Sequence, residues 1–145
     1  MNPTAVTLTG MACYADIHGL HTGEQFAVDG PLGPRLDICA IAYMQAEGGT
    51  IPPEFYADEI ASIRLIECSA KAMAAIRAIS DVLDSSVCED PIAPGVSVPN
   101  YIEHVSNWVA TNPIGATKPP TTSEVIGRIL RAANTLATQT PARAA

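Results

Sequence analysis

The sequence predicts an all-α fold. A single domain over residues 1–145 is expected to form an irregular bundle of five or six helices with two long proline-containing loops. The length of 145 residues suits one domain. Aromatic residues make up 5 % of the chain and 23 residues are alanine, a composition that favours close-packed helices over a sheet. Apolar residues also recur at intervals of three and four. We expect residues 1–3 and 138–145 to fray.

The first half of the chain is predicted to contain helices separated by glycine and proline. The first helix covers about residues 4–20, and residues 21–30 form a short segment that runs into a turn. Residues 30–34 are predicted to be loop, because each proline removes a donor. A second helix spans residues 35–47, with Asp37 in its first turn and Gly48-Gly49 after its end.

A proline pair at residues 52–53 opens the next helical run. Ser69 is the predicted N-cap of a longer helix over residues 70–83. Two alternatives remain for this region, a single kinked helix and a short strand over residues 62–66.

The second half is predicted to contain two helices and both long loops. The loops cover residues 84–99 and 111–120, each with several prolines. One helix spans about residues 99–110. The last begins at Thr121, which forms a capping box with Glu124, and continues to about residue 137.

Charge and cysteine usage exclude several classes of protein. The net charge is −7, with −9 over residues 1–90 and +2 over residues 91–145. A negative net charge disfavours binding to a phosphate backbone. The four cysteines form no Cys-x-x-Cys pair. No basic leader with a long apolar segment and no apolar run of membrane-spanning length is visible. We expect a soluble, cytoplasmic protein with reduced thiols.

Three short segments occur in a distinctive order along residues 4–137. An aromatic-Ala-x-Asp segment at residues 26–29 precedes Cys39-Ala40, and Trp108 is followed by a loop and by a last helix with Leu130 and Ala132-Ala133. This order resembles a small domain-of-unknown-function family of actinobacteria and their phages. The chain departs from the family pattern after Trp108, because three residues separate Trp108 from Asn112 and no Asp follows. The resemblance implies a helical fold in a bacterial or phage cytoplasm and no particular activity.

Two candidate chemical sites can be assembled from the sequence. His18, His21 and Glu24 are spaced at i, i+3 and i+6, and a His-His-carboxylate set could hold zinc or iron. Cys39 could act as a nucleophile with His104 or His18 as its base, although its place in an apolar stripe favours burial. A small metal-binding or cysteine-dependent enzyme is therefore the alternative function.

The absence of a recognised catalytic motif favours a different function. We expect a small accessory or regulatory protein that binds another protein or itself, without a cofactor and without contact to nucleic acid or membrane. Aromatic side chains are the natural anchors of such an interface. The candidate anchors are Phe26, Phe55, Tyr56, Tyr101 and Trp108.

Overall fold

The chain has an α+β fold, and the prediction of an all-α bundle is wrong. The computed structural model describes residues 2–113 and 115–139. Within these residues there are seven helices and two small antiparallel sheets of two strands each. In chain order the elements are α1 (Pro3–His18), β1 (Ala27–Gly30), β2 (Gly33–Leu36), α2 (Ile38–Glu47), α3 (Glu54–Ala57), α4 (Glu59–Glu67), α5 (Ala70–Asp81), β3 (Cys88–Ala93), β4 (Val96–Asn100), α6 (Tyr101–Ala110) and α7 (Thr122–Gln139).

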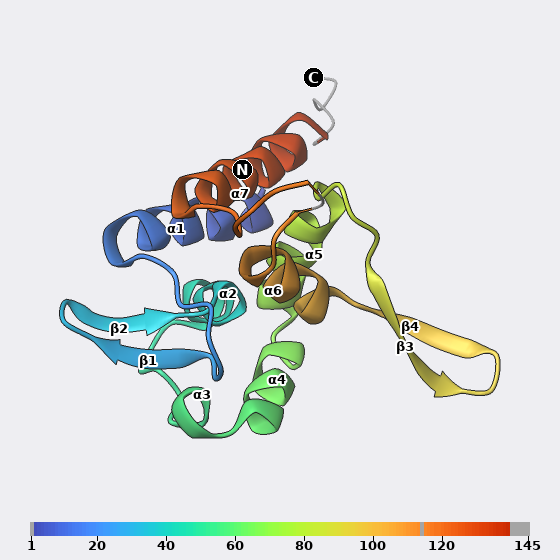
Figure 1. Ribbon diagram of the computed structural model, residues 1–145, viewed down its shortest axis with the longest axis horizontal. Coiled ribbons are helices and arrows are strands. Elements are labelled where there is room, and N and C mark those ends of the chain that lie inside the picture. Colours follow the sequence, from blue (N-terminus) through green and yellow to red (C-terminus); the bar gives the residue numbers. More distant parts are fainter. Residues whose placement is uncertain (1, 114, 140–145) are drawn as a thin grey trace, which may run out of the picture.

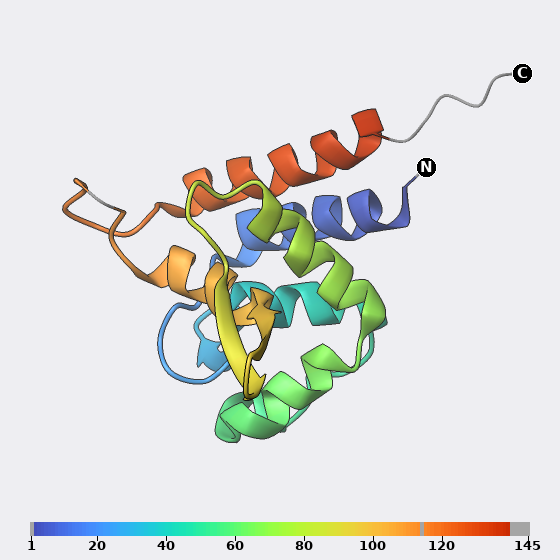
Figure 2. The same cartoon turned by 90° about the vertical axis from the view of Figure 1, so that its right-hand side faces the viewer.

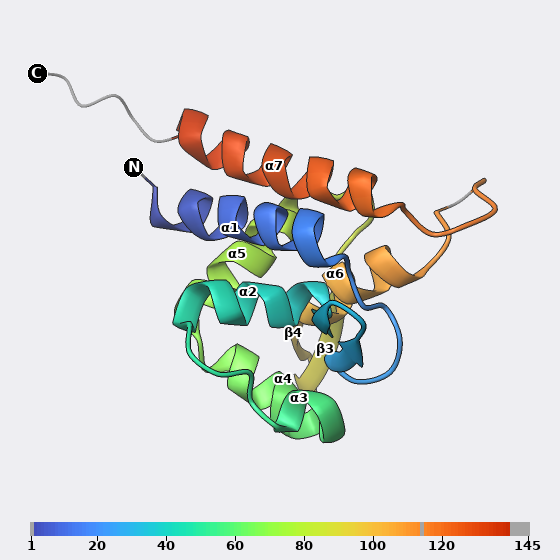
Figure 3. The same cartoon turned by 90° about the vertical axis from the view of Figure 1, so that its left-hand side faces the viewer.

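The helices are stacked in layers, and each hairpin lies at one side of the stack (Figure 1). Helices α1 and α7 lie side by side and run antiparallel at one end (Figures 2 and 3). Below them lie α2, α5 and α6, and the short helices α3 and α4 close the other end. The hairpin β3–β4 projects from the body beside α6. Helices far apart in the sequence therefore share one core.

Small side chains allow the helices to approach closely, as the composition predicts. The face that α1 buries consists of Leu8, Met11, Ala12 and Ala15, and the face that α7 buries consists of Val125, Ile129, Ala132 and Ala133. Alanine fills the interface without rotamer entropy and keeps the two backbones close. Ile129 is completely buried, so its truncation to alanine should cost about 2–5 kcal/mol.

Several helix starts are fixed by side-chain caps. The predicted N-cap of α5 is confirmed, because Ser69 Oγ accepts a hydrogen bond from the Ala72 N–H at 3.1 Å. Thr121 Oγ1 accepts from the Glu124 N–H at 3.2 Å, which is one half of the predicted capping box, while the Glu124 carboxylate accepts from the Thr121 hydroxyl at 3.2 Å. Asp37 lies one position outside the first turn of α2 and caps it, because the two residues before it belong to β2.

Most residues of the two hairpins lie where the sequence predicts turn or loop, but Arg35 and Leu36 of β2 and Asn100 of β4 lie in segments predicted to be helical. In β1–β2, Ala27 pairs with Leu36 and Gly30 with Gly33, and in β3–β4, Cys88 pairs with Asn100. Pro34, Pro91 and Pro99 lie within these strands, where they argue against strand in a sequence pattern. A two-stranded ribbon tolerates them, because each strand has one edge that needs no ladder partner.

Part of each terminus that was predicted to fray belongs to a helix. Pro3 begins α1, with Asn2 as its N-cap, and Thr138 and Gln139 belong to α7. Residues 1 and 140–145, which the prediction also included, lie outside the described residues.

Among the described helices, none combines the length and the apolar character that crossing a membrane requires.

Candidate functional site

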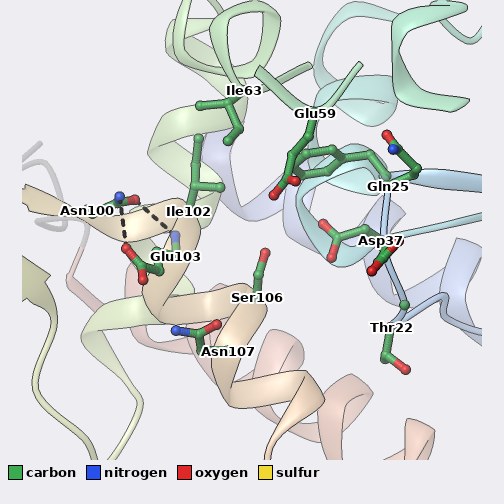
Figure 4. A pocket seen from close by; sticks show the side chains of 13 residues that line it. Thr22, Gln25, Asp37, Glu59, Ile63, Asn100, Ile102, Glu103, Ser106 and Asn107 are labelled. Atoms are coloured by element: carbon green, nitrogen blue, oxygen red, sulfur yellow. Dashed lines mark hydrogen bonds between the residues drawn. The ribbon is translucent and has the colours of Figure 1, made fainter. Parts of the chain in front are cut away.

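A pocket of about 640 Å³ opens between the loop after α1, the start of α2, helix α4 and helix α6 (Figure 4). This volume lies in the range of small-ligand sites. We call it the acidic pocket. Its polar lining includes Glu24, Gln25, Asp37, Glu59, Glu103 and Ser106.

Asp37 is the most perturbed ionisable group of the pocket. Its Oδ1 accepts a hydrogen bond from the Cys39 N–H at 2.8 Å, so the carboxyl is held at the N-terminus of α2. Burial raises the pKa of Asp37 from its ordinary value of 3.8 to about 6, and the N–H groups of Cys39 and Ala40, His21 and the Ser106 hydroxyl only partly oppose this rise. The fold therefore holds a carboxylate where water solvates it poorly.

Other acidic side chains surround Asp37. Figure 4 shows the Asp37 and Glu59 carboxylates and the Ser106 hydroxyl directed toward the same space. Glu103 lies on the α6 side, where its N–H and a carboxylate oxygen bond the Asn100 side chain at 3.0 and 3.2 Å. Glu24 adds a fourth carboxyl group, and no Lys, Arg or His is among the described residues that line the pocket.

Gln25 contributes a strained and unsatisfied group to the same wall. Its φ of 66° lies in the left-handed region, and within the described part of the chain no other residue apart from glycine has a positive φ. Its Oε1 is buried and accepts no hydrogen bond from any described residue. A buried amide oxygen without a donor costs about 1–3 kcal/mol. Among the described residues, Gln25 Oε1 thus lacks a hydrogen-bond donor, in a pocket whose described lining has no positively charged side chain.

The predicted metal ligands are not brought together. His18 packs against the Tyr14 ring, with 4.4 Å between the ring centroids, while His21 Nε2 lies 2.8 Å from the Glu24 backbone oxygen. Across residues 2–113 and 115–139, no group of three or more His, Cys, Asp or Glu side chains is placed to hold a metal ion. Because α1 ends at His18, with Gly19 as its C-cap, His21 and Glu24 do not continue the helical face on which His18 lies.

Cys39 is a core residue in this structure. Its side chain is fully buried, and its Sγ lies 3.8 Å from the Ile102 carbonyl oxygen and 3.5 Å from Ser106 Oγ. Burial and the nearby Asp37 raise the pKa of the Cys39 thiol well above its ordinary value. The thiolate that a nucleophile requires is therefore disfavoured.

The predicted aromatic anchors differ in their environment. Phe26 and Phe55 are buried, 6.0 Å apart between ring centroids, and contribute to the core. Tyr56, Tyr101 and Trp108 are partly buried, and Arg77 and Arg128 lie over the Tyr101 and Trp108 rings. The role of the five aromatic side chains in holding a partner stays a prediction.

The projecting hairpin β3–β4 carries exposed aliphatic side chains instead. Ile92, Val96 and Val98 are 64 %, 50 % and 41 % exposed. Val96, Val98 and Asn100 alternate along β4 and so share one face of the strand, and Asn100 also lines the acidic pocket. Strand β4 therefore carries exposed apolar side chains and ends in the pocket lining at Asn100.

A second hollow, of about 820 Å³, lies beside the other part of α6. We call it the His104 hollow. The residues that line it include Ser85, Cys88, His104, Trp108 and Arg128. His104 is buried, with Nδ1 2.6 Å from Ser80 Oγ and Nε2 2.8 Å from Ser85 Oγ. Arg128 donates from Nη1 to the Val82 carbonyl oxygen at 2.7 Å.

The sequence points to Glu24 as a metal ligand and to Asp37 as a residue at a helix start, but it does not predict the acidic pocket, because the residues of the pocket come from separate elements. Glu24, Asp37, Glu59 and Glu103 share no spacing that a motif search could detect. Asp37 does carry a local signal, since it precedes an apolar helical stripe, but that signal indicates a helix start and not its burial. Comparison of the chain with protein-family models, with curated proteins and with solved structures finds no match.

Proposed function

We propose that the protein is a small accessory or regulatory protein that binds a partner protein and takes a basic side chain of that partner into the acidic pocket. One observation carries the proposal. Four carboxyl groups, one of them in a desolvated position, line a pocket with no described basic residue. A cation in this space would offset the desolvation of Asp37 and would also be attracted by the three neighbouring carboxylates.

The unsatisfied oxygen of Gln25 supports a donor-rich cation. An arginine or lysine side chain brings N–H donors together with its charge, whereas a simple metal ion needs a set of converging ligands that the described residues do not form. A guanidinium group has five donors and so can bond several oxygens at once. Arginine is therefore the preferred occupant.

The neighbouring hairpin supports a protein over a free amine as the source of the cation. Val96 and Val98 give exposed apolar surface on β4, the strand that ends at Asn100 in the pocket lining, and a small amine in the pocket would leave this surface uncovered. Exposed apolar surface next to a polar site is typical of protein interfaces.

The first test uses a matched pair of small ligands. n-Butylguanidinium and n-butylurea have nearly the same shape, but the urea is neutral. We expect the guanidinium to cause saturable NMR shifts at Asp37 and Ser106 with a dissociation constant on the order of millimolar, and the urea to cause none. Lowering the pH from 7.5 to 5 should weaken binding about tenfold, because Asp37 is protonated below a pKa of about 6.

Two variants complete this test. Asp37→Asn should weaken guanidinium binding at least about fivefold, because it removes the poorly solvated charge at the start of α2. Asp58→Asn is the control: Asp58 caps α4 through a bond from the Ala61 N–H at 3.0 Å and does not line the pocket. Equal shifts with the urea, or equal binding by Asp37→Asn, would show that the pocket does not recognise a cation.

The second test asks whether the cation belongs to a protein. Random peptides displayed on phage are selected on the wild-type chain and counter-selected on Asp37→Asn. We expect enriched peptides with an arginine or lysine beside apolar residues, and weaker binding of these peptides to a Val96→Ser, Val98→Ser variant that still binds n-butylguanidinium. Enriched peptides without basic residues, or peptides that bind the Val96→Ser, Val98→Ser variant as tightly as the wild type, would refute the proposal that the cation belongs to a protein.

A further inference from the structure

The His104 hollow contains a hydrogen-bonded chain that the proposed binding function does not use. Ser85, on the loop after α5, is exposed, while His104 on α6 and Ser80 on α5 are 6 % and 5 % exposed. The imidazole lies between the two hydroxyls, at 2.8 Å from Ser85 Oγ and 2.6 Å from Ser80 Oγ. An accessible hydroxyl, an imidazole and a buried group on the far ring nitrogen are the parts of a nucleophile–base arrangement.

From this geometry we propose that Ser85 and His104 form a nucleophile–base pair that hydrolyses esters of small carboxylic acids in the His104 hollow. In the tautomer with the proton on Nδ1, that N–H donates to Ser80 Oγ, and Nε2 accepts the Ser85 hydroxyl proton. Ser80 acts as a positioning residue, since it holds the ring through the nitrogen that faces away from Ser85.

The protonation state of His104 suits a general base. Burial lowers the pKa of His104 below its ordinary value, and a hydrogen bond with the Ser85 backbone opposes this only in part. The ring is therefore neutral at pH 7 and has a free electron pair for the serine proton.

The reaction follows the atoms of this pair. The Ser85 Oγ–H bond breaks, its proton moves to Nε2, and Oγ forms a bond to the ester carbonyl carbon. The carbon–oxygen bond to the alcohol then breaks, and the departing alkoxide takes the proton from Nε2. Water attacks the acyl-serine with His104 again as the base, which releases the carboxylic acid and restores the Ser85 hydroxyl.

The walls of the hollow indicate the class of ester. Trp108 provides an aromatic surface for a flat alcohol group, so aryl esters are the preferred class. Arg128 lies 5.8 Å over the Trp108 ring and uses Nη1 for the Val82 carbonyl oxygen. A guanidinium has further donors, which can favour the negative charge that develops on the carbonyl oxygen.

The test uses an alkyl fluorophosphonate, which labels activated serines, and p-nitrophenyl acetate as substrate. We expect one phosphonyl group per chain, located on Ser85 by peptide mass spectrometry, and release of p-nitrophenol above the rate in buffer. Ser85→Ala should abolish the label and lower hydrolysis at least tenfold; this residue is exposed, so the variant should fold. Ser97→Ala is the control, because Ser97 is an exposed serine on β4 outside the hollow, where its hydroxyl bonds Glu89 Oε2 at 3.0 Å, and its loss should leave both unchanged.

The positioning role of Ser80 has its own readout. Ser80→Ala should slow the labelling of Ser85 at least threefold while the final label per chain stays the same, whereas a loss of folding would reduce the final amount instead. Absence of label on Ser85, equal label on Ser97, or unchanged ester hydrolysis by Ser85→Ala would overturn the proposal.

Discussion

Helix α6 contributes to two hollows that differ in charge and in the state of their ionisable groups. Ile102, Glu103 and Ser106 line the acidic pocket, whereas His104 and Trp108 line the His104 hollow. Residues four apart lie on one face of a helix, so 102 and 106 share one side and 104 and 108 another. One helix can therefore supply two sites of unlike chemistry.

The difference between the two hollows arises from their other walls. In the acidic pocket, the start of α2 and helix α4 add Asp37 and Glu59, and no described basic residue balances them. In the His104 hollow, α7 brings Arg128 to the Val82 carbonyl oxygen and near Asp84. Burial shifts a pKa in each hollow and favours the uncharged form in both. It raises the pKa of Asp37, which favours the protonated carboxyl, and it lowers the pKa of His104, which favours the deprotonated ring. The described lining of the acidic pocket thus contains no basic residue, and His21 acts on Asp37 only from outside that lining, whereas the His104 hollow is lined by Arg128.

The largest effect is expected from removing the charge of Asp37. A folded-state pKa of about 6 against an ordinary value of 3.8 means that the folded chain binds this proton more tightly than the unfolded chain. The contribution of Asp37 to stability therefore falls as the pH rises from about 4 to 6, and the ionised carboxylate costs at most about 3 kcal/mol above that range. Asparagine caps a helix as well as aspartate. Asp37→Asn should accordingly stabilise the fold at pH 8, as measured by urea unfolding.

The comparison with the wild type at several pH values isolates this group from the other carboxyls. The gain from Asp37→Asn should shrink as the pH is lowered from 8 to 5, because the wild-type carboxyl becomes protonated. Asp58→Asn, at an exposed N-cap, should show no such dependence. A destabilised Asp37→Asn at pH 8 would mean that the charge is already compensated within the fold.

A smaller effect is expected from the basic group of the other hollow. Arg128 is 24 % exposed and bonds the Val82 carbonyl oxygen at 2.7 Å, while its ion-pair partner Asp84 is 90 % exposed at 3.6 Å. Arg128→Met should lower the free energy of unfolding by about 1–2 kcal/mol through the lost backbone bond. Asp84→Asn should change it by less than about 0.5 kcal/mol, because an exposed ion pair is screened by water.

Urea unfolding of these two variants decides what holds Arg128 in the hollow. If Asp84→Asn cost as much as Arg128→Met, the ion pair and not the backbone acceptor would position the guanidinium. The charge of Arg128 in the His104 hollow would then be compensated by the exposed carboxylate of Asp84 and not by a group inside the hollow.

Much of the helical part of the fold could be predicted from the sequence. Helix α7 has a capping box and an apolar stripe, and both features are local. The hairpins could not be predicted in this way. Pro34, Pro91 and Pro99 are evidence against strand in a buried sheet, and only the three-dimensional structure shows that each lies in an isolated ribbon with a free edge on either strand.

The candidate sites were less predictable than the fold, for a different reason. Asp37 was identified as a residue at a helix start, but its burial depends on α4 and α6, which pack from distant parts of the sequence. His104 and Ser85 are 19 positions apart and meet because the chain between them forms the projecting hairpin. Aromatic residues were considered as exposed anchors, yet Phe26 and Phe55 are buried in the core, and exposed aliphatic residues lie on the hairpin.

The smallest expected effect separates burial from repulsion as the cause of the Asp37 shift. Burial is the largest cause of the raised pKa, and no neighbouring carboxylate contributes to it, although Glu59 lines the same pocket. Glu59→Gln should therefore leave the pKa of Asp37 near 6, which carbon-13 NMR titration of its carboxyl carbon would measure. A fall toward 4 would show that Glu59 repels Asp37, and the acidic pocket would then be a group of mutually dependent charges instead of one desolvated carboxylate with solvated neighbours.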